Sequence, residues 1–370
     1  MYTPSLATVR KYVDSGLVTE RKHNTKPYSI FTYTPECQFS RAWDKVTLNT
    51  RGLIFDTQSG ICIARSYPKF FNMNEVEETS FENLPEEIPV IQEKIDGSLI
   101  IVFWDAYNSS WEVATKGSFH SEQAEYVREN LLEKYEKHLL EPIANYPTDT
   151  YLFEVIYPEN RIVIDYGNAR QLILHGRMTR VWRTGEFLDT SASILKHTRT
   201  VTPRIYNISQ IGTNFDKFFK NREGYVLVYP SDPPFRVKVK SPDYVLAHRL
   251  VSSATLENTL SIMLAGEFKE TFNTVPFHIR DLYDDLYSAL QTRYNEILLV
   301  LSDFERKAQP LLDQPRKTLA KIVQETLHPT LHVLGYKIIS GMDFRTVLGK
   351  TGKPLIWDVV LKTLKDSKNG

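Results

Sequence analysis

Residues 92–104 read QEKIDGSLIIVFW and hold a lysine, an Asp-Gly dipeptide and a long apolar run within thirteen residues. The run SLIIVFW predicts a buried β-strand, because it is short, apolar and rich in β-branched and aromatic residues. The preceding VIQEK predicts a second strand, and Asp96-Gly97 between two strands is the strongest short signal of a β-hairpin. Lys94 is therefore expected at the end of one strand, on the edge of the core.

A lysine in this position has two interpretations. The amine is nucleophilic only when unprotonated, and partial burial or nearby positive charge lowers its pKa from the usual ~10.4. A rigid strand end would hold such a nucleophile, with Gly97 letting a ligand approach and Asp96 orienting the amine or a metal-bound water. The alternative is a plain hairpin with an incidental lysine, and K-x-D-G by itself favours that alternative.

Two textures divide the chain near residue 245. Short β-branched or aromatic runs bounded by Gly, Pro, Asp or Asn predict strands at 51–56, 61–67, 98–105, 111–117, 151–157, 161–166, 171–178, 224–230 and 235–241. Residues 121–140 follow helical spacing, with Ser118 or Ser121 as the N-cap. After residue 245 the periodicity predicts helices at 244–265, 279–309, 316–335 and 354–366. The pattern indicates a mixed α+β domain followed by a smaller helical domain.

Composition narrows the class of protein. The 370 residues carry 45 basic and 45 acidic side chains, so binding of nucleic acid would need a local basic patch rather than global charge. Cys37 and Cys62 form no C-x-x-C, which argues against a zinc site or a disulfide scaffold and favours a reducing compartment. The start has no signal-peptide h-region and no apolar window approaches a membrane span. We expect a cytoplasmic protein with no membrane partner.

The segment FRVKVKS, 235–241, alternates strictly between polar and apolar residues. In a strand Val237 and Val239 would face the core, and the opposite face would carry Arg236, Lys238 and Lys240. Like charges side by side repel unless an anion lies there, which favours a polyphosphate contact. The alternative is a solvated edge strand that uses lysines against aggregation.

Three further motifs carry polar residues with both functional and structural interpretations. Glu154 lies inside the apolar YLFEVIY and needs a cation, a donor or a metal-bound water, although a structural ion pair would also serve. Lys116 in TKGS follows a strand and precedes a helix, a suitable position for binding phosphate. Glu223 opens EGYVLV, which is otherwise a plain strand after a turn. Taken singly, ordinary surface charge or core packing is the favoured interpretation for Arg51, Lys69 and Phe71.

In order, these motifs resemble those of the covalent nucleotidyltransferase superfamily of ATP-dependent ligases and capping enzymes: KIDGS (94–98), YLFEVIYPENRIV (151–163), LILHGRM (172–178), EGYVLV (223–228) and VKVKSPDY (237–244). They are most similar to the phage T4 RNA ligase 1 family, which also carries counterparts of YSIFTY, RGLIFD, KFFNMNE and TKGS. The resemblance implies an antiparallel-sheet-rich nucleotidyltransferase (ATP-grasp-like ligase) domain over residues 1–245. An all-helical C-terminal domain over residues 246–370 would then serve RNA substrate specificity.

The resemblance also implies roles for individual residues. Lys94 would attack the α-phosphorus of ATP, release pyrophosphate and hold AMP, while Phe71 would stack on adenine. The implied catalytic set is Lys94, Lys238, Lys240, Glu154, Glu223 and Lys116. The implied nucleotide-binding set is Tyr33, Arg51, Lys69, Phe71, Glu154, Lys238, Lys240 and Tyr244. Magnesium would accompany ATP, with manganese as a substitute. The metal ligands stay open, because Glu270 is only a poor counterpart of the family's acidic C-terminal residue.

Three hypotheses follow for the activity. The first is an ATP-dependent RNA ligase that joins 5′-phosphate and 3′-hydroxyl ends, with cleaved tRNA anticodon loops as substrate and an end-healing polynucleotide kinase/phosphatase acting before it. It would work as a monomer in the cytoplasm, that of the host cell if the source is a virus such as a bacteriophage. The second is an mRNA capping enzyme or DNA ligase, which usually carries an OB-fold after the last motif. The third is a non-catalytic nucleic-acid-binding protein, which predicts loss of the motif lysines.

Overall fold

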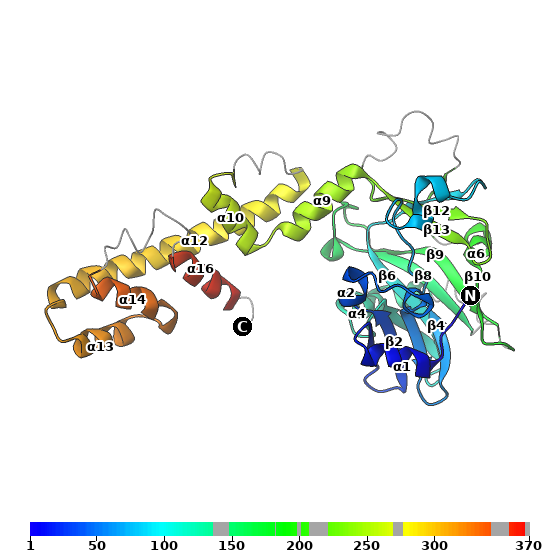
Figure 1. The fold of residues 1–370 in the computed structure, drawn as a ribbon, viewed down its shortest axis with the longest axis horizontal. Helices are drawn as coiled ribbons and strands as arrows, with labels where there is room; N and C mark the ends of the chain where they lie inside the picture. Colours follow the sequence, from blue (N-terminus) through cyan, green and yellow to red (C-terminus); the bar gives the residue numbers. More distant parts are fainter. Residues whose placement is uncertain are drawn as a thin grey trace. The chain divides into compact units, whose positions relative to one another are not determined.

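The structure is a computed structural model that describes residues 1–135, 148–181, 183–197, 201–206, 221–268, 277–341 and 355–366 (Figure 1). Contacts along the chain divide it into two compact units, Met1–Val245 and Leu246–Gly370. Each unit has its own hydrophobic core.

Three antiparallel sheets form the framework of the first unit. One sheet has the order β1 (Val18–Lys22), β2 (Tyr28–Tyr33), β3 (Arg51–Asp56) and β4 (Ile61–Arg65). The central sheet has the order β10 (Phe187–Asp189), β9 (Gln171–Arg180), β8 (Asp149–Ile156), β6 (Ser98–Asp105) and β7 (Ser110–Thr115). The third has the order β11 (Ile205–Tyr206), β5 (Val90–Lys94), β12 (Gly224–Tyr229) and β13 (Phe235–Lys240). The antiparallel α+β architecture is confirmed.

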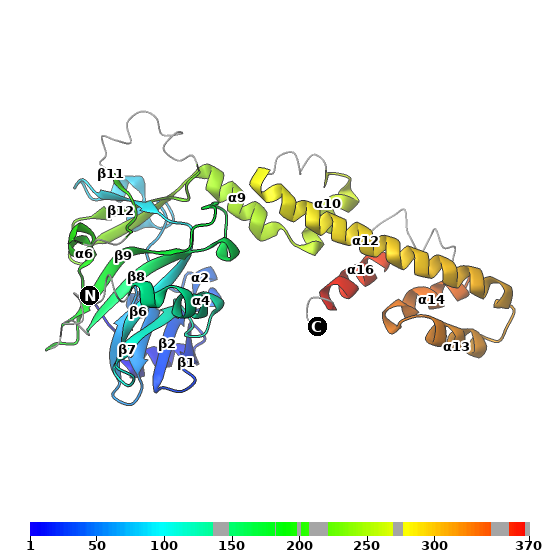
Figure 2. The same ribbon diagram turned by 180° about the vertical axis from the view of Figure 1, so that it is seen from behind.

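Strand β6, the apolar run of the opening motif, is buried on both faces of the central sheet. Successive side chains point to opposite sides of a strand. Ile101 and Phe103 therefore join a core shared with the β1–β4 sheet, whereas Ile100 and Val102 pack toward α4 (Glu122–Asn130). Figure 2 shows β9, β8, β6 and β7 following one another across this sheet. This two-sided burial explains why SLIIVFW reads as a continuous apolar run rather than an alternating one.

Short helices complete the first unit. The α-helices are α1 (Leu6–Asp14), α2 (Pro35–Phe39), α3 (Lys45–Asn49), α4, α5 (Leu132–Tyr135) and α6 (Ser191–His197). The 3₁₀ helices lie at Glu77–Thr79, Phe81–Asn83 and Pro158–Asn160. Ser121 caps α4 by accepting a hydrogen bond from the Ala124 amide, as one of the two expected caps. The predicted helix over 121–140 is split after Asn130, and its last five residues lie outside the described residues.

The hairpin prediction is wrong. Strand β5 pairs with β11 and β12, whereas β6 pairs with β7 and β8, so Asp96-Gly97 carries the chain from one sheet to another. A Cβ at Gly97 would lie 2.5 Å from the carbonyl oxygen of Val155 in β8. Glycine is required here for close packing between sheets. The Asp-Gly dipeptide alone fits both this close packing and a tight turn.

The predicted strand at 161–166 is also absent, because its backbone bonds to a side chain instead of to another strand. The amides of Val163 and Ile164 both donate to Oδ2 of Asp96, at 2.9 and 2.8 Å. Residues 161–166 form bends and irregular backbone without strand pairing. An apolar, β-branched sequence therefore serves as a loop that satisfies a buried carboxylate.

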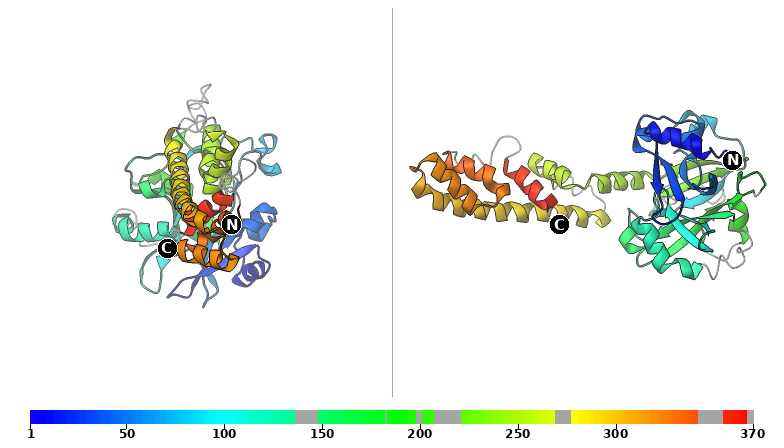
Figure 3. Two further views of the ribbon diagram at one scale, coloured as in Figure 1. Left: turned by 90° about the vertical axis from the view of Figure 1, so that its left-hand side faces the viewer. Right: turned by 90° about the horizontal axis from the view of Figure 1, so that it is seen from below.

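Helices make up the described part of the second unit. They are α9 (Pro242–Ser253), which begins in the first unit, α10 (Leu256–Ala265), α12 (Phe277–Ala308), α13 (Arg316–Thr326), α14 (His332–Ile339) and α16 (Leu355–Asp366). Two 3₁₀ helices lie at Gln309–Leu311 and Pro329–Leu331. The long α12 contacts α10, α13, α14 and α16, and Figure 3 shows the later helices beside it. Among the described residues, no helix is long and apolar enough to cross a membrane.

Candidate active site

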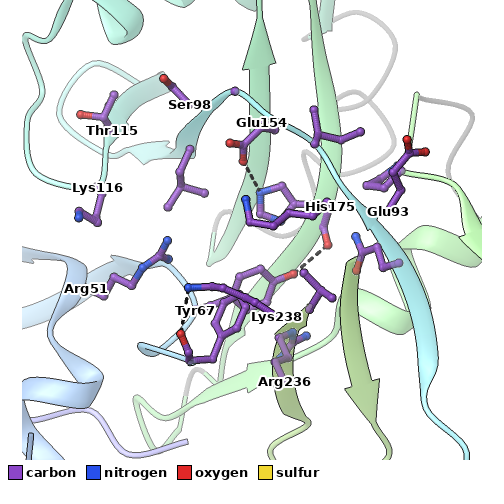
Figure 4. A pocket seen from close by; sticks show the side chains of 18 of the residues that line it. Arg51, Tyr67, Glu93, Ser98, Thr115, Lys116, Glu154, His175, Arg236 and Lys238 are labelled. Carbon is purple, nitrogen blue, oxygen red and sulfur yellow. Dashed lines mark hydrogen bonds and ion pairs between the residues drawn. The ribbon is translucent and has the colours of Figure 1, made fainter. Parts of the chain in front are cut away.

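A cavity of about 510 Å³ in the first unit gathers most of the expected site residues. Its walls carry the side chains of Arg51, Lys94, Lys116, Glu154, Lys238 and Lys240. Figure 4 shows Arg51, Lys116 and Lys238 pointing toward one space from different strands or strand ends. Together with Arg236, six basic side chains line this cavity, and like charges repel each other unless an anion or acidic side chain offsets them. The arrangement is suited to a polyanionic ligand.

Lys94 ends β5 and faces Glu223 across the third sheet. Its Nζ lies 2.6 Å from Oε2 of Glu223, and Nζ of Lys240 lies 3.0 Å from Oε1 of the same carboxylate. The register explains this bridge, because Lys94 and Lys240 both pair with Gly224 of β12, from opposite sides. Lys94 and Lys240 lie two strands apart, with their backbones separated by roughly 10 Å. They therefore share the carboxylate of Glu223, the residue before Gly224.

Gly224 itself has no room for a side chain. A Cβ there would lie 2.0 Å from the carbonyl oxygen of Val239, and its φ is +147°. Glycine alone adopts this conformation without steric cost. The glycine of the EGYVLV motif therefore holds the end of β12 close against β13, which brings Glu223 to both lysines.

The predicted basic face of β13 is present, although its members have different partners. Lys238 donates from Nζ to the carbonyl oxygen of Phe70 at 2.9 Å. Burial lowers the pKa of Lys238 well below its usual value, and the charges of Arg51 and Lys69 lower it further. Arg236 forms a 2.6 Å ion pair with Asp189. On the other face Val237 is buried, whereas Val239 is only partly buried.

The pKa values of Glu154 and His175, which lie side by side, are shifted in opposite directions. Oε2 of Glu154 lies 3.6 Å from Nε2 of His175. Burial raises the pKa of Glu154 to about 7; the charge of Lys94 opposes this shift and Glu223 adds to it. Burial lowers the pKa of His175 to about 3, and the charges of Arg51 and Lys94 add to that shift. At neutral pH the imidazole is therefore uncharged, and the carboxyl is divided between its two protonation states.

Asp96 anchors the connection that follows the nucleophile candidate. Besides accepting from two amides of the 161–166 segment, it accepts a 2.7 Å hydrogen bond from the Tyr244 hydroxyl. Burial, the nearby Glu223 charge and this hydrogen bond raise the pKa of Tyr244. Tyr244 also lies under Nζ of Lys240, 5.0 Å from its ring centre. Asp96 thus holds protein donors, which fix the chain between the two sheets.

The remaining expected residues lie beside the cavity rather than inside it. Nζ of Lys69 lies 4.8 Å from the Phe71 ring centre, and both residues line an adjoining cavity of about 590 Å³. Nζ of Lys116 lies 5.0 Å from the ring centre of Tyr33. Phe70, the neighbour of the residue expected to stack on adenine, lines the cavity that holds Lys94.

Sequence reasoning missed two residues that shape the cavity wall. His175 and Tyr67 both line it, and each is at most 15% exposed. Arg236, expected on the basic face of β13, lines it too. LILHGRM offered a signal for His175, because a histidine followed by glycine interrupts an otherwise apolar strand. Tyr67 had no signal, since its role depends on a contact with residues more than a hundred positions away.

The described residues suit ATP but hold no preformed metal site. Within them, no group of three or more His, Cys, Asp and Glu side chains is placed to bind a metal ion. The cavity instead offers cations for phosphates, and apolar or uncharged surfaces from Phe70, Val226 and His175 for a base. Magnesium is commonly bound by one or two carboxylates together with substrate phosphates, so this arrangement suits a metal that arrives with the nucleotide. Glu270 lies outside the described residues.

The antiparallel sheets around the lysine-lined cavity give the fold of a known ligase. Across 98% of this chain and 88% of the other, the fold is similar to a solved structure, "Putative ATP-dependent DNA ligase from Aquifex aeolicus", with a TM-score of 0.51 and 15% identity. That likeness concerns the fold alone.

Sequence comparison gives the family. The RNA ligase family model matches residues 49–244, and the chain belongs to this RNA ligase family. A "Putative RNA ligase" of Thermovibrio ammonificans is 31% identical over 293 residues, covering 75% of this chain and 71% of that protein. A "Putative bifunctional polynucleotide kinase/RNA ligase" of Autographa californica nuclear polyhedrosis virus is 27% identical over 68% of this chain and 38% of its own length. The expectation of an ATP-dependent RNA ligase is confirmed at the level of the family.

Proposed function

We propose that this RNA ligase seals a 5′-phosphate to a 3′-hydroxyl in single-stranded RNA through a covalent lysyl-AMP on Lys94. The observation that carries the proposal is the placement of Lys94 at a strand end, in a cavity with five other basic side chains and a carboxylate 2.6 Å from its amine. A nucleophile, cations for the phosphates and an acceptor for the amine's proton are what nucleotidyl transfer requires.

The first step forms a bond between Nζ of Lys94 and the α-phosphorus of ATP and breaks the bond to the bridging oxygen of pyrophosphate. Glu223 takes the proton that the amine must lose, because its carboxylate already contacts Nζ. Lys238 and Lys240 stabilise the charge that develops on the α-phosphate, as fixed cations do in a partly buried site. Arg51 and Lys116 hold the departing pyrophosphate, whose charge their side chains match.

The adenine lies in the part of the cavity lined by His175 and Val226. An uncharged imidazole and an aliphatic side chain offer a purine flat, weakly polar surfaces. Phe71 is assigned no adenine contact here, because its ring lies in the adjoining cavity with Lys69. Glu154 would contact either the ribose or the magnesium ion that accompanies ATP. Manganese would substitute for magnesium there.

In the later steps AMP passes to the RNA 5′-phosphate, and the 3′-hydroxyl then displaces it. We propose broken tRNA anticodon loops as the natural substrate, with the enzyme acting as a monomer after an end-healing polynucleotide kinase/phosphatase. A relative whose name joins a kinase to an RNA ligase supports that order. The helices after residue 245 would contribute RNA specificity, in place of the OB-fold that a capping enzyme or DNA ligase usually carries.

End chemistry tests this proposal directly. We expect the protein with magnesium and ATP to circularise a 5′-phosphorylated single-stranded RNA and to leave a 5′-hydroxyl RNA unchanged. The same RNA as a nicked duplex is the matched comparison. Sealing of the nicked duplex alone would overturn the assignment of single-stranded ends. A cleaved anticodon stem-loop should be sealed faster than an unstructured RNA of equal length if tRNA repair is the function.

A further inference from the structure

Three side chains that line the cavity, His175, Tyr67 and Arg236, form a column. The rings of His175 and Tyr67 are stacked, with centres 5.6 Å apart and planes 30° apart. On Tyr67 also lies the guanidinium of Arg236, 4.2 Å from the phenol ring centre. Figure 4 shows Tyr67 between the other two. Asp189 holds the far end through its 2.6 Å ion pair with Arg236. The column therefore runs from the ion pair with Asp189 to the His175 ring.

Tyr67 is fixed in this place from several sides. Its hydroxyl donates to the carbonyl oxygen of His175 at 2.8 Å and lies 3.0 Å from Oγ of Ser191. Only 6% of Tyr67 is exposed. A Cβ at residue 176 would lie 1.7 Å from the Tyr67 hydroxyl, so Gly176 is required for the ring to approach β9 this closely. Gly176, the glycine of LILHGRM, thus leaves the space that Tyr67 occupies beside His175.

We propose that Tyr67 and Arg236 are positioning residues that hold the His175 imidazole flat as the platform on which the adenine of ATP stacks. This inference rests on the proposed function and adds residues to it that act through His175. An unsupported imidazole turns about its side-chain bonds, and fixing its orientation when ATP binds costs free energy. A ring that is already packed in place does not incur this cost. A positively charged group on the outer face of a phenol ring is also attracted to that ring, which strengthens the column.

A double-mutant cycle on ATP affinity tests the column. The measured quantity is the ATP concentration at half-maximal rate of label transfer from α-labelled ATP to the protein. Tyr67→Leu and His175→Ala should each raise this concentration about tenfold, the effect of losing one base-stacking contact. The maximal rate should stay within about twofold, because the reacting groups are untouched. In the His175→Ala background, Tyr67→Leu should add little, since the two residues act as one unit.

Two further variants separate positioning from general stability. Tyr67→Phe keeps the ring and should restore most of the ATP affinity lost in Tyr67→Leu. Tyr135→Leu is the matched control, because Tyr135 is also buried and its hydroxyl accepts from the Leu172 amide of the same strand β9. It should lower the melting temperature without changing the half-saturating ATP concentration.

The outcomes distinguish the inference from the function on which it rests. If the wild type takes no label, the proposed function is wrong. If the wild type is labelled, two results overturn only the column: an unchanged half-saturating concentration in Tyr67→Leu, or an equal effect of that substitution with and without His175. Should Tyr67→Leu fail to fold, the same cycle with Tyr67→Phe decides, with a smaller expected effect that must vanish in His175→Ala.

Discussion

Glu154 and His175 lie 3.6 Å apart, and the pKa of each is shifted toward its uncharged form. Burial raises the pKa of Glu154 to about 7 and lowers that of His175 to about 3. Perturbed groups of this kind gather at functional sites, because catalysis and ligand binding both use desolvated polar residues. The pair therefore gives the cavity wall an uncharged imidazole and a carboxyl that titrates near neutral pH.

The raised pKa of Glu154 predicts a pH-dependent cost to stability. Between pH 4.5 and about 7 the folded chain keeps a proton that the unfolded chain has lost, so the free energy of unfolding falls as pH rises through this window. Glu154→Gln removes this pH dependence. The free energy of unfolding of the variant minus that of the wild type should therefore be greater at pH 8 than at pH 4.5, by on the order of 2 kcal/mol. Denaturant unfolding of both proteins across this range measures it.

Glu20→Gln provides a control with the opposite sign. Burial alone would raise the pKa of Glu20, but hydrogen bonds from Arg10 and Ser29 leave it lowered. Its stabilising contribution is present above the unfolded pKa near 4.5 and is lost as pH falls below it. Glu20→Gln should therefore lose stability relative to wild type at pH 8. Parallel unfolding curves for Glu154→Gln and wild type at all pH values would contradict the assignment of a raised pKa.

At the scale of elements, the sequence predicts strands better than their partners. The boundaries of β3 and β6 agree with the runs RGLIFD and SLIIVFWD, because local side-chain pattern determines both. Pairing does not follow from such a pattern. Asp96-Gly97 is equally compatible with a hairpin and with a crossing between sheets, and the decision depends on Val155, nearly sixty residues later.

The site follows the same division. Lys94, Lys238 and Glu154 stand out in the sequence, because polar residues inside or beside apolar strands need a reason to be there. Whether they meet depends on the register of sheets that the sequence does not reveal. Tyr67 is not a polar residue that interrupts an apolar strand, so its role is evident only from its contacts in the folded protein.

Gly224→Ala tests the element on which the cavity depends. The added Cβ would meet the backbone of β13 at 2.0 Å, and a backbone oxygen cannot move away cheaply. We expect a loss of about 3 kcal/mol in the free energy of unfolding and a loss of label transfer, because Glu223 would be displaced from both lysines. Denaturant unfolding of the variant and the wild type measures the loss of stability, and adduct formation with labelled ATP measures the loss of label transfer.

Gly60→Ala is its matched control. Gly60 has a φ of +71°, and nothing lies within 4 Å of an added Cβ. The substitution should therefore cost only the backbone strain, ~1 kcal/mol, and leave label transfer unchanged. Equal losses of activity in the two variants would show that close approach of β12 and β13 is not what matters.

At the scale of the whole molecule, the two units have separate cores. The clusters that pack around the sheets lie within Met1–Val245, and the cluster around α12 lies within Leu246–Gly370. We expect calorimetry to resolve two transitions. ATP at one hundred times its dissociation constant should stabilise the first unit by about 2.7 kcal/mol and move only the transition of that unit. A single transition that ATP shifts as a whole would show that the units unfold as one.

The central claim is that Lys94 becomes covalently adenylylated. Mass spectrometry of the intact protein after incubation with magnesium and ATP, followed by peptide mapping, tests it most directly. We expect one added AMP on the peptide that carries Lys94. Pyrophosphate should remove it, and it should be absent in Lys94→Arg, which keeps the charge but lacks a lysine amine. An adduct on another residue, an adduct that persists in Lys94→Arg, or no adduct at all would contradict it.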